Sequence, residues 1–154
     1  MVEVSYDAFT EAFLSKIREY EFCRLPQEDR QHIVDGYMKR ACAKFSEVCV
    51  YEIGIGDDET RNYTFGREDE EVRDDDVVEI IDIVSDGMVY QWLQQFQYKQ
   101  ENLENMITTA DYSRYSPAEL TYRITNAYKM CKRDFTNRIR EYSYRHGDLT
   151  DLHL

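Results

Sequence analysis

The sequence feature that most constrains this chain is a run from Asp74 to about Asn105 in which apolar side chains recur at helical spacing. Side chains three or four positions apart stack along one face of an α-helix. One such face comprises Val77, Ile80, Ile81, Val84, Met88, Trp92 and Phe96, and a second apolar stripe comprises Val78, Ile83, Val89 and Leu93. A helix that is apolar over more than half of its circumference needs neighbours on several sides. The pattern therefore predicts one long helix at the centre of the fold.

Gly87 lies inside this predicted helix. Glycine in a helix interior costs about 1 kcal/mol relative to alanine, so its use there indicates that another backbone or an aromatic ring approaches closely. The alternative is a surface glycine without a packing role. We predict that Gly87, Met88 and Trp92 pack in the core, together with Phe135 from the C-terminal region.

Two amphipathic helices are predicted before the central one. Ser5 can cap a helix that runs to about Phe22, and Pro26 suits the first turn of a second helix that runs to about Val48. The short link between them favours an antiparallel helical hairpin. Between residues 49 and 73 the helical period disappears. Alternating side chains in VCVYEIGIG and NYTF, separated by GDDET, predict a small extended segment or β-hairpin there.

The last predicted helix begins at the sequence SPAE. Ser116 as N-cap, Pro117 in the first turn and Glu119 as the third helical residue form a capping box. Gly147 is placed to end this helix. The tail that follows, residues 148–154, is either a frayed terminus or a strand that adds to the sheet edge of a partner.

These elements predict an all-α fold, a four-to-five-helix bundle around the long central helix. The bundle carries a small extended or β-hairpin insertion near residues 49–73 and an extended C-terminal tail. A chain of 154 residues is long enough for one domain with a substantial core, and 2 prolines and 6 glycines favour helices over turn-rich sheets. We expect a single helical domain over residues 1–147, followed by the tail at 148–154.

The charge of the chain is high and unevenly distributed. The formal net charge is −12, which argues against a nucleic-acid-binding groove because phosphate binding relies on Lys and Arg. Residues 52–82 hold thirteen Asp or Glu against three Arg, whereas residues 114–146 hold eight Lys or Arg against three acids. Opposite poles of this kind can join copies of one protein head to tail, or can be two solvated faces without a partner.

No sequence pattern points to catalysis or to a bound cofactor. There is no nucleophile elbow and no Gly-rich phosphate loop, and the four cysteines form no CxxC pair or metal-type cluster. The carboxylates of residues 68–76 lie in a solvated acidic run, which does not provide the desolvated pocket that general acid–base chemistry requires. We therefore expect a protein that is not an enzyme and that has no metal or cofactor.

Other features favour assembly with proteins in a reducing compartment. The thirteen tyrosines suit surfaces where one end of the side chain is buried and the other meets a partner. The cysteine pattern fits a reduced cytosolic setting. We expect neither an export signal nor a membrane partner, because no apolar run approaches the length of about eighteen residues that spans a bilayer.

Three stretches of the chain resemble the head–tail connector proteins of tailed bacteriophages, also called adaptor or head-completion proteins. They are GMVYQWLQ at residues 87–94, ENLENMITTADYSRYSPAEL at 101–120 and REYSYRHGDLTDLHL at 140–154. The resemblance spans most of the chain and leaves out residues 50–73. It implies a virion structural protein, made in the cytoplasm of a bacterial host, that forms a ring of about twelve copies in the virion neck. The implied partners are the portal protein, further copies of the chain, and the tail or the next neck protein. Genomic DNA would pass through the ring during ejection without sequence-specific binding.

The resemblance also suggests roles for particular residues. An acidic lining of the ring lumen, along which DNA slides, is expected at Glu68, Asp69, Glu70, Glu71, Asp74, Asp75 and Asp76. A basic inter-subunit face is expected at Arg123, Lys129, Lys132, Arg133 and Arg140. A strap that docks into the portal is expected to comprise Leu149, Thr150, Asp151, Leu152, His153 and Leu154.

Two alternative functions stay open at this point. A tail-side stopper or terminator ring would share this composition and differ only in its position in the neck. A soluble acidic inhibitor that mimics DNA would also be small and rich in carboxylates.

Overall fold

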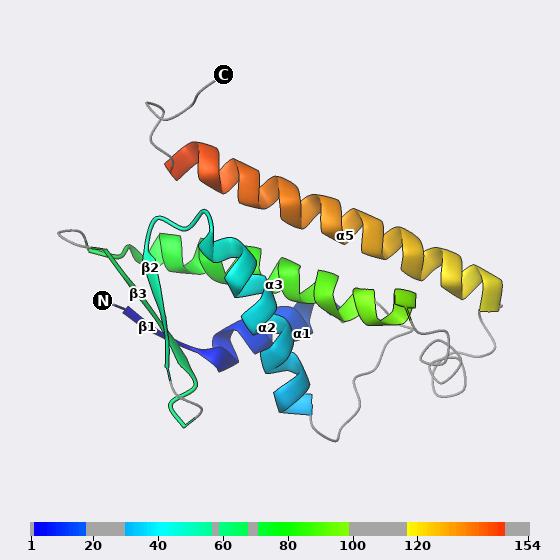
Figure 1. The fold of residues 1–154 in the computed structure, drawn as a ribbon, viewed down its shortest axis with the longest axis horizontal. Helices are drawn as coiled ribbons and strands as arrows, with labels where there is room; N and C mark the ends of the chain where they lie inside the picture. The colour runs from blue at the N-terminus through cyan, green and yellow to red at the C-terminus, as the bar shows by residue number, and fades with distance from the viewer. Residues whose placement is uncertain (1, 18–29, 57–58, 68–70, 99–116, 147–154) are drawn as a thin grey trace.

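The computed structural model describes residues 2–17, 30–56, 59–67, 71–98 and 117–146. Within these ranges the fold is mainly α-helical, with a small three-stranded sheet at one end (Figure 1). In chain order the elements are β1 (Val2–Ser5), α1 (Tyr6–Ile17), α2 (Arg30–Ser46), β2 (Glu52–Ile55), β3 (Asn62–Gly66), α3 (Asp74–Tyr98) and α5 (Pro117–His146). Their buried apolar side chains form one continuous cluster.

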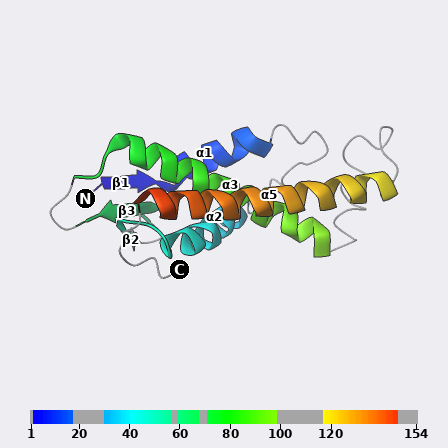
Figure 2. The ribbon, with the colours of Figure 1, turned by 90° about the horizontal axis from the view of Figure 1, so that it is seen from above.

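α3 is the element on which the other described helices pack. α1, α2 and α5 all contact α3, and Figure 2 shows α5 running across the molecule with α1 and α2 on either side of its axis. The almost fully buried side chains of α3 include Ile80, Ile83, Val84, Met88, Trp92 and Leu93. The prediction of a central helix that is covered on several sides is confirmed. Val78 is an exception, because the second apolar stripe included it and it is 67% exposed.

The start of α3 agrees with the prediction. Asp74, Asp75 and Asp76 form its first turn, where negative charge is favourable because the helix macrodipole places partial positive charge at the N-terminus. The helix is described to Tyr98. The rest of the predicted run, to Asn105, lies outside the described residues.

The packing role predicted for Gly87 is confirmed. A Cβ atom on this residue would lie 2.6 Å from Cζ of Phe135 and 2.8 Å from Cβ of Ala41. Close-packed interiors do not tolerate carbon atoms at such distances, so a residue without a side chain lets α5 and α2 approach α3 here. Phe135, Met88 and Trp92 are all buried, as predicted.

The predicted β-hairpin is confirmed, and a third strand joins it. β2 and β3 pair antiparallel, with Ile55 opposite Tyr63 and Glu52 opposite Gly66. β1 pairs antiparallel with the other edge of β3, which gives the order β1-β3-β2. The all-α prediction is therefore corrected to a mainly α fold. The four residues VEVS are too short a pattern to indicate a strand without sight of the partner strand.

One face of the sheet belongs to the same core as the helices. Side chains along β3 alternate in burial, with Tyr63 and Phe65 inward. The ring centroids of Tyr63 and Tyr6 lie 4.9 Å apart. Ser5 caps α1 as predicted, because its Oγ accepts a hydrogen bond from the Asp7 N–H at 3.3 Å. β1 therefore leads directly into α1.

α5 is a helix that begins at Pro117, as predicted, and is described over 30 residues to His146. Its buried side is formed by Ile124, Tyr128, Phe135 and Tyr142. Several predictions fall outside the described residues: the N-cap at Ser116, the helix end at Gly147, the tail at 148–154, the end of the first helix near Phe22 and the start of the second at Pro26.

Candidate functional site

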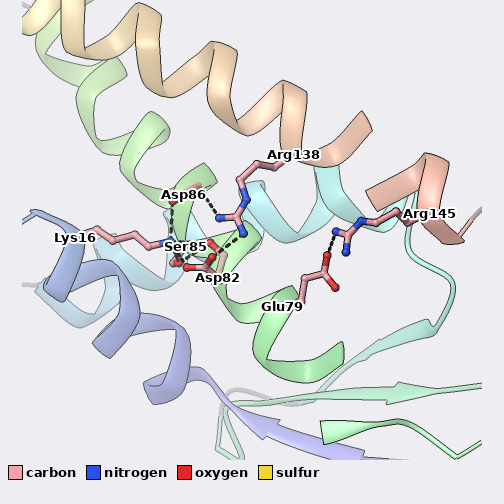
Figure 3. A network of polar contacts seen from close by, with 7 residues as sticks. All are labelled: Lys16, Glu79, Asp82, Ser85, Asp86, Arg138 and Arg145. Carbon is pink, nitrogen blue, oxygen red and sulfur yellow. Dashed lines mark hydrogen bonds and ion pairs between the residues drawn. The ribbon is translucent and has the colours of Figure 1, made fainter. Parts of the chain in front are cut away.

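A network of charged side chains joins α1, α3 and α5 (Figure 3). Lys16 of α1 extends to α3, where its Nζ donates hydrogen bonds to Ser85 Oγ at 2.7 Å and to Asp86 Oδ1 at 2.6 Å. The same ammonium group donates to the backbone carbonyl of Asp82 at 2.7 Å. Asp82 and Asp86 are four residues apart, so both carboxylates lie on one side of α3.

Arg138 of α5 contacts the same two aspartates. Its Nη2 donates to Asp82 Oδ2 at 2.6 Å, and its Nη1 donates to Asp86 Oδ2. Burial would raise the pKa of Asp82, but hydrogen bonds from Lys16 and Arg138 outweigh it and lower that pKa. Burial acts to lower the pKa of Arg138, but hydrogen bonds to Asp86 and Asp82 raise it. The two cations and the two carboxylates of the network therefore neutralise one another, which suits a role in holding the helices together rather than in proton transfer.

This network was not predicted from the sequence, although the sequence contains two signals for it. Asp82 and Asp86 recur at i, i+4 on the polar side of the central helix. Arg138 follows Phe135 by three positions and therefore lies near the buried side of α5. A charge near a buried face requires a partner, but the sequence does not show which helix supplies it.

A second cluster holds the β2–β3 turn against α1 and α2. Arg61 donates to both carboxylate oxygens of Asp35, with Nη2 at 2.9 Å from Oδ1 and Nε at 3.2 Å from Oδ2. Its Nη1 also donates to Asp7 Oδ1 at 3.2 Å. The hydrogen bonds to Asp35 raise the pKa of the guanidinium. Arg61 has a φ of 46°, so this contact holds a backbone conformation that residues with a Cβ rarely adopt.

Three potential metal ligands meet where the start of α3 approaches the end of α5. Ligand atoms of Asp76, Glu79 and His146 lie within 4.8 Å of one another, the one such group in the described ranges. The sequence predicts no metal site. Both carboxylates already have protein partners, because Tyr51 Oη donates to Asp76 Oδ2 at 2.5 Å and Arg145 forms an ion pair with Glu79. Arg145 supplies the positive charge that a metal ion would bring, so we interpret these contacts as another junction between α3 and α5.

A groove of about 450 Å³ opens beside the charged network. Its apolar lining comes from Ala12, Val78 and Ile81, and its polar lining comes from Asp75, Glu79, Asp82 and Arg138. Val78 is exposed because this side of the first turns of α3 is left uncovered by α1 and α5. The apolar floor and mainly acidic rim make the groove a candidate binding surface.

The predicted basic face lies on the outside of α5. Its residues are all exposed, namely Arg123, Lys129, Lys132, Arg133 and Arg140. Arg123 pairs with Glu119 of the predicted capping box at 3.5 Å. Arg133 lies 3.8 Å from Asp134. Within the described part of the chain, no ion pair involves Lys129, Lys132 or Arg140.

Large apolar and aromatic side chains accompany these cations. Tyr122, Met130 and Tyr144 of α5 are 68%, 53% and 65% exposed. The many tyrosines predict partner surfaces, and the exposed Tyr122 and Tyr144 occupy positions of that kind. Most other tyrosines that the structure describes are buried, so only a part of the tyrosine side chains in the described ranges is available to a partner.

The predicted acidic lining is divided by the fold. Glu71, Asp74 and Asp75 are exposed around the start of α3. Asp76 is only partly exposed and accepts the hydrogen bond from Tyr51. Glu68, Asp69 and Glu70 lie outside the described residues, as do all six residues of the predicted strap, 149–154.

The cysteines in the described ranges are free thiols. Burial raises the pKa of Cys42 to about 12, and burial also raises the pKa of Cys49. A thiol reacts as a nucleophile only when it is deprotonated, so Cys42 is unreactive at neutral pH. Cys23 lies outside the described residues.

No protein-family model, curated protein or solved structure matches this chain. None of the described helices combines the length and the apolar character that crossing a membrane requires. The connector family, its partners and its place in a virion therefore stay predictions.

Proposed function

We propose that this protein is a non-enzymatic structural component of a tailed-bacteriophage virion. In this proposal it is a head–tail connector that forms a ring on the portal, joins the capsid to the tail and lets DNA pass. The resemblance of residues 87–94, 101–120 and 140–154 supports the family, and the distribution of charge on the folded chain supports an assembly role.

The observation that carries the proposal is a pair of exposed, oppositely charged surfaces on one chain. Glu71, Asp74 and Asp75 are exposed around the start of α3, and Lys129 and Arg140 are exposed on the outside of α5. No ion pair within the described ranges neutralises either Asp75 or the two cations. Opposite charges on different surfaces of one chain favour heterologous contacts between copies, which close into a ring when the rotation between neighbours permits.

The polar network supports this role because a connector must hold its two contact surfaces in a fixed relation. Lys16 and Arg138 join α1 and α5 to the same two aspartates of α3. Arg145 joins the end of α5 to Glu79 near the start of α3. The acidic and basic surfaces therefore belong to one packed unit.

The proposed assembly is a ring of about twelve copies in the virion neck. The acidic side chains from Glu68 to Asp74 would face the DNA path, Asp75 would lie at the contact between copies, and the tail at 149–154 would dock into the portal. The other contacts would be made to the tail or the next neck protein. The chain would be made in the cytoplasm of the bacterial host and would need neither a cofactor nor a membrane.

The test is binding of the purified full chain to DNA-filled, tailless heads of the cognate phage. Co-sedimentation should show saturable binding, and electron microscopy of the particles should show a ring at the portal vertex. Empty shells that lack the portal are the control and should not retain the chain. A folded chain that ignores portal-bearing heads would contradict the proposal, and a ring on isolated tails would place it at the tail side of the neck instead.

The DNA-mimic alternative has less support from the described surface. A mimic needs a continuous acidic face, whereas this chain exposes cations along α5. A stable monomer that ignores the portal and displaces DNA from an enzyme would favour the mimic.

A further inference from the structure

We infer that the groove beside α3 binds the outer side of α5 from a second copy of this chain. The inference rests on the proposed assembly function and names the surfaces that would meet. We call the first surface the α3 groove, defined by Asp75, Val78 and Ile81 with the adjoining rim. The second is the α5 patch, defined by Lys129, Met130 and Arg133.

The α3 groove offers apolar surface and uncompensated negative charge. Val78 is 67% exposed at its floor, and Ile81 and Ala12 extend the apolar lining. On its rim, Glu79 and Asp82 already have arginine partners, whereas Asp75 has no ion pair in the described part of the chain. An exposed apolar side chain beside an unpaired carboxylate fits an occupant with an apolar centre and a cationic edge.

The α5 patch has that composition. Met130 is 53% exposed, and the exposed cation Arg133 lies one turn after it. Lys129, which directly precedes Met130, is also exposed and lies one turn before Arg133. Methionine is flexible and adapts to irregular apolar surfaces. Arg133 has only a long contact of 3.8 Å with Asp134, and Lys129 has no ion-pair partner among the described residues. A groove of about 450 Å³ admits several side chains from one face of a helix.

The two surfaces cannot meet within one molecule. The α5 patch is exposed, while α3 packs against the side of α5 that carries Tyr128 and Phe135. The contact must therefore join different copies, and each copy still has one groove and one patch to offer. This is a heterologous contact, which propagates from copy to copy. Nucleic acid is a poorer occupant of the groove, because its acidic rim repels phosphate.

The test uses two variants that each damage one surface. The patch variant carries Lys129→Glu and Arg133→Glu, and the groove variant carries Asp75→Lys and Val78→Lys. A control variant, Lys39→Glu with Lys44→Glu, makes the same change in net charge as the patch variant, on exposed positions of α2. Circular dichroism should show the helix content of the unsubstituted chain in all three. Sedimentation velocity over a concentration series then measures self-association.

We expect the unsubstituted chain and the control to form oligomers larger than dimers. Each surface variant alone should associate at least about tenfold more weakly. A mixture of the two surface variants should also assemble, because the intact groove of one variant meets the intact patch of the other and the two charge-exchanged surfaces attract each other. A chain carrying all four surface substitutions should regain assembly, because the charges are exchanged.

Other outcomes overturn the inference and are distinct from failure of the proposed function. Undiminished association of either surface variant, or a mixture that stays monomeric, would exclude this contact. An unsubstituted chain that is monomeric at all concentrations would also exclude it, while binding to portal-bearing heads would separately decide the connector proposal. Binding of a labelled DNA duplex that only the patch variant loses would assign the α5 patch to nucleic acid.

Discussion

At the scale of single residues, the packing of this protein depends on places where a side chain is missing. Gly87 sits between the ring of Phe135 and the methyl group of Ala41, so three helices approach one another where it has no Cβ. Gly36 in α2 is different, because a Cβ there would have only the Arg40 guanidinium nearby, at 3.7 Å. Substitution by alanine is therefore expected to have opposite effects on stability at the two helical glycines.

Gly87→Ala is expected to lower the free energy of unfolding by about 2 kcal/mol, because overpacking outweighs the better helix propensity of alanine. Gly36→Ala should leave stability unchanged or raise it by up to about 1 kcal/mol. Urea denaturation followed by circular dichroism measures both. Effects of the same sign and size at the two positions would contradict the close contact at Gly87.

Arg61 combines a side-chain role with a backbone role that substitutions can separate. Alanine and glycine both remove the contacts to Asp35 and Asp7, but only glycine tolerates the φ of 46° without strain. We expect Arg61→Ala to destabilise the fold by about 2 kcal/mol and Arg61→Gly by about 1 kcal/mol. Thermal unfolding of both variants ranks them, and a milder effect for alanine would show that the positive φ carries no cost.

At the scale of elements, charged side chains determine how α1 and α5 sit on α3. Lys16 reaches α3 from α1, and Arg138 reaches it from α5, so the two outer helices share the carboxylates of Asp82 and Asp86. Loss of one aspartate leaves the other to neutralise both cations. The contribution of each aspartate to the free energy of unfolding should therefore depend on pH, because it requires the ionised carboxylate.

Asp82→Asn is expected to cost about 1 kcal/mol at pH 7, a small value because the Asp82 side chain is 49% exposed and screened by solvent. The folded-state pKa of Asp82 lies below its ordinary 3.8, so the unfolded chain takes up the proton first as the pH falls. The stabilisation is therefore complete above about pH 5 and is lost as the pH falls through 3.8 toward the folded-state pKa.

The measurement compares the unfolding free energies of the variant and the unsubstituted chain at several pH values. The difference between them should shrink as the pH falls below 3.8 toward the folded-state pKa of Asp82. Asp134→Asn is the matched control, because Asp134 is 59% exposed and has only the 3.8 Å contact with Arg133. A difference for Asp82→Asn that stays constant from neutral to acid pH would show that its charge does not stabilise the helix junction.

At the scale of the whole molecule, assembly depends on where the fold leaves charged side chains exposed and without an ion-pair partner. The exposed surface around the start of α3 is acidic, and the outside of α5 is basic. The net charge of −12 hides this separation. An assembly made of such copies should weaken as salt screens the contacts between them.

Removal of residues 148–154 tests the proposed strap without touching the described core. Every residue of that core lies before residue 147, so helix content and the unfolding midpoint should stay unchanged. Attachment to filled, portal-bearing heads should be lost, because the backbone and leucine side chains that would add to the portal are gone. If the shortened chain still attaches and completes infectious particles, the strap proposal is wrong.

The sequence alone predicted the elements whose signal is local. The apolar spacing of α3, the glycine inside it, the proline start of α5 and the alternation of the hairpin all report how one segment is buried. Such patterns repeat every two to four residues, so they can be read without knowing the neighbours. The exposed basic residues of α5 belong to this class too, because they lie opposite its apolar side.

Tertiary structure decided what depends on residues far apart in the chain. β1 becomes a strand only because β3 lies beside it, and Val78 is exposed only because α1 and α5 leave one side of α3 open. Lys16 and Asp86, 70 positions apart, meet at 2.6 Å. Such contacts between distant residues decide which charges are neutralised within the chain. They also decide which charges stay available to a partner. Periodicity shows which face of an element is buried, whereas the identity of the neighbour is a property of three-dimensional packing.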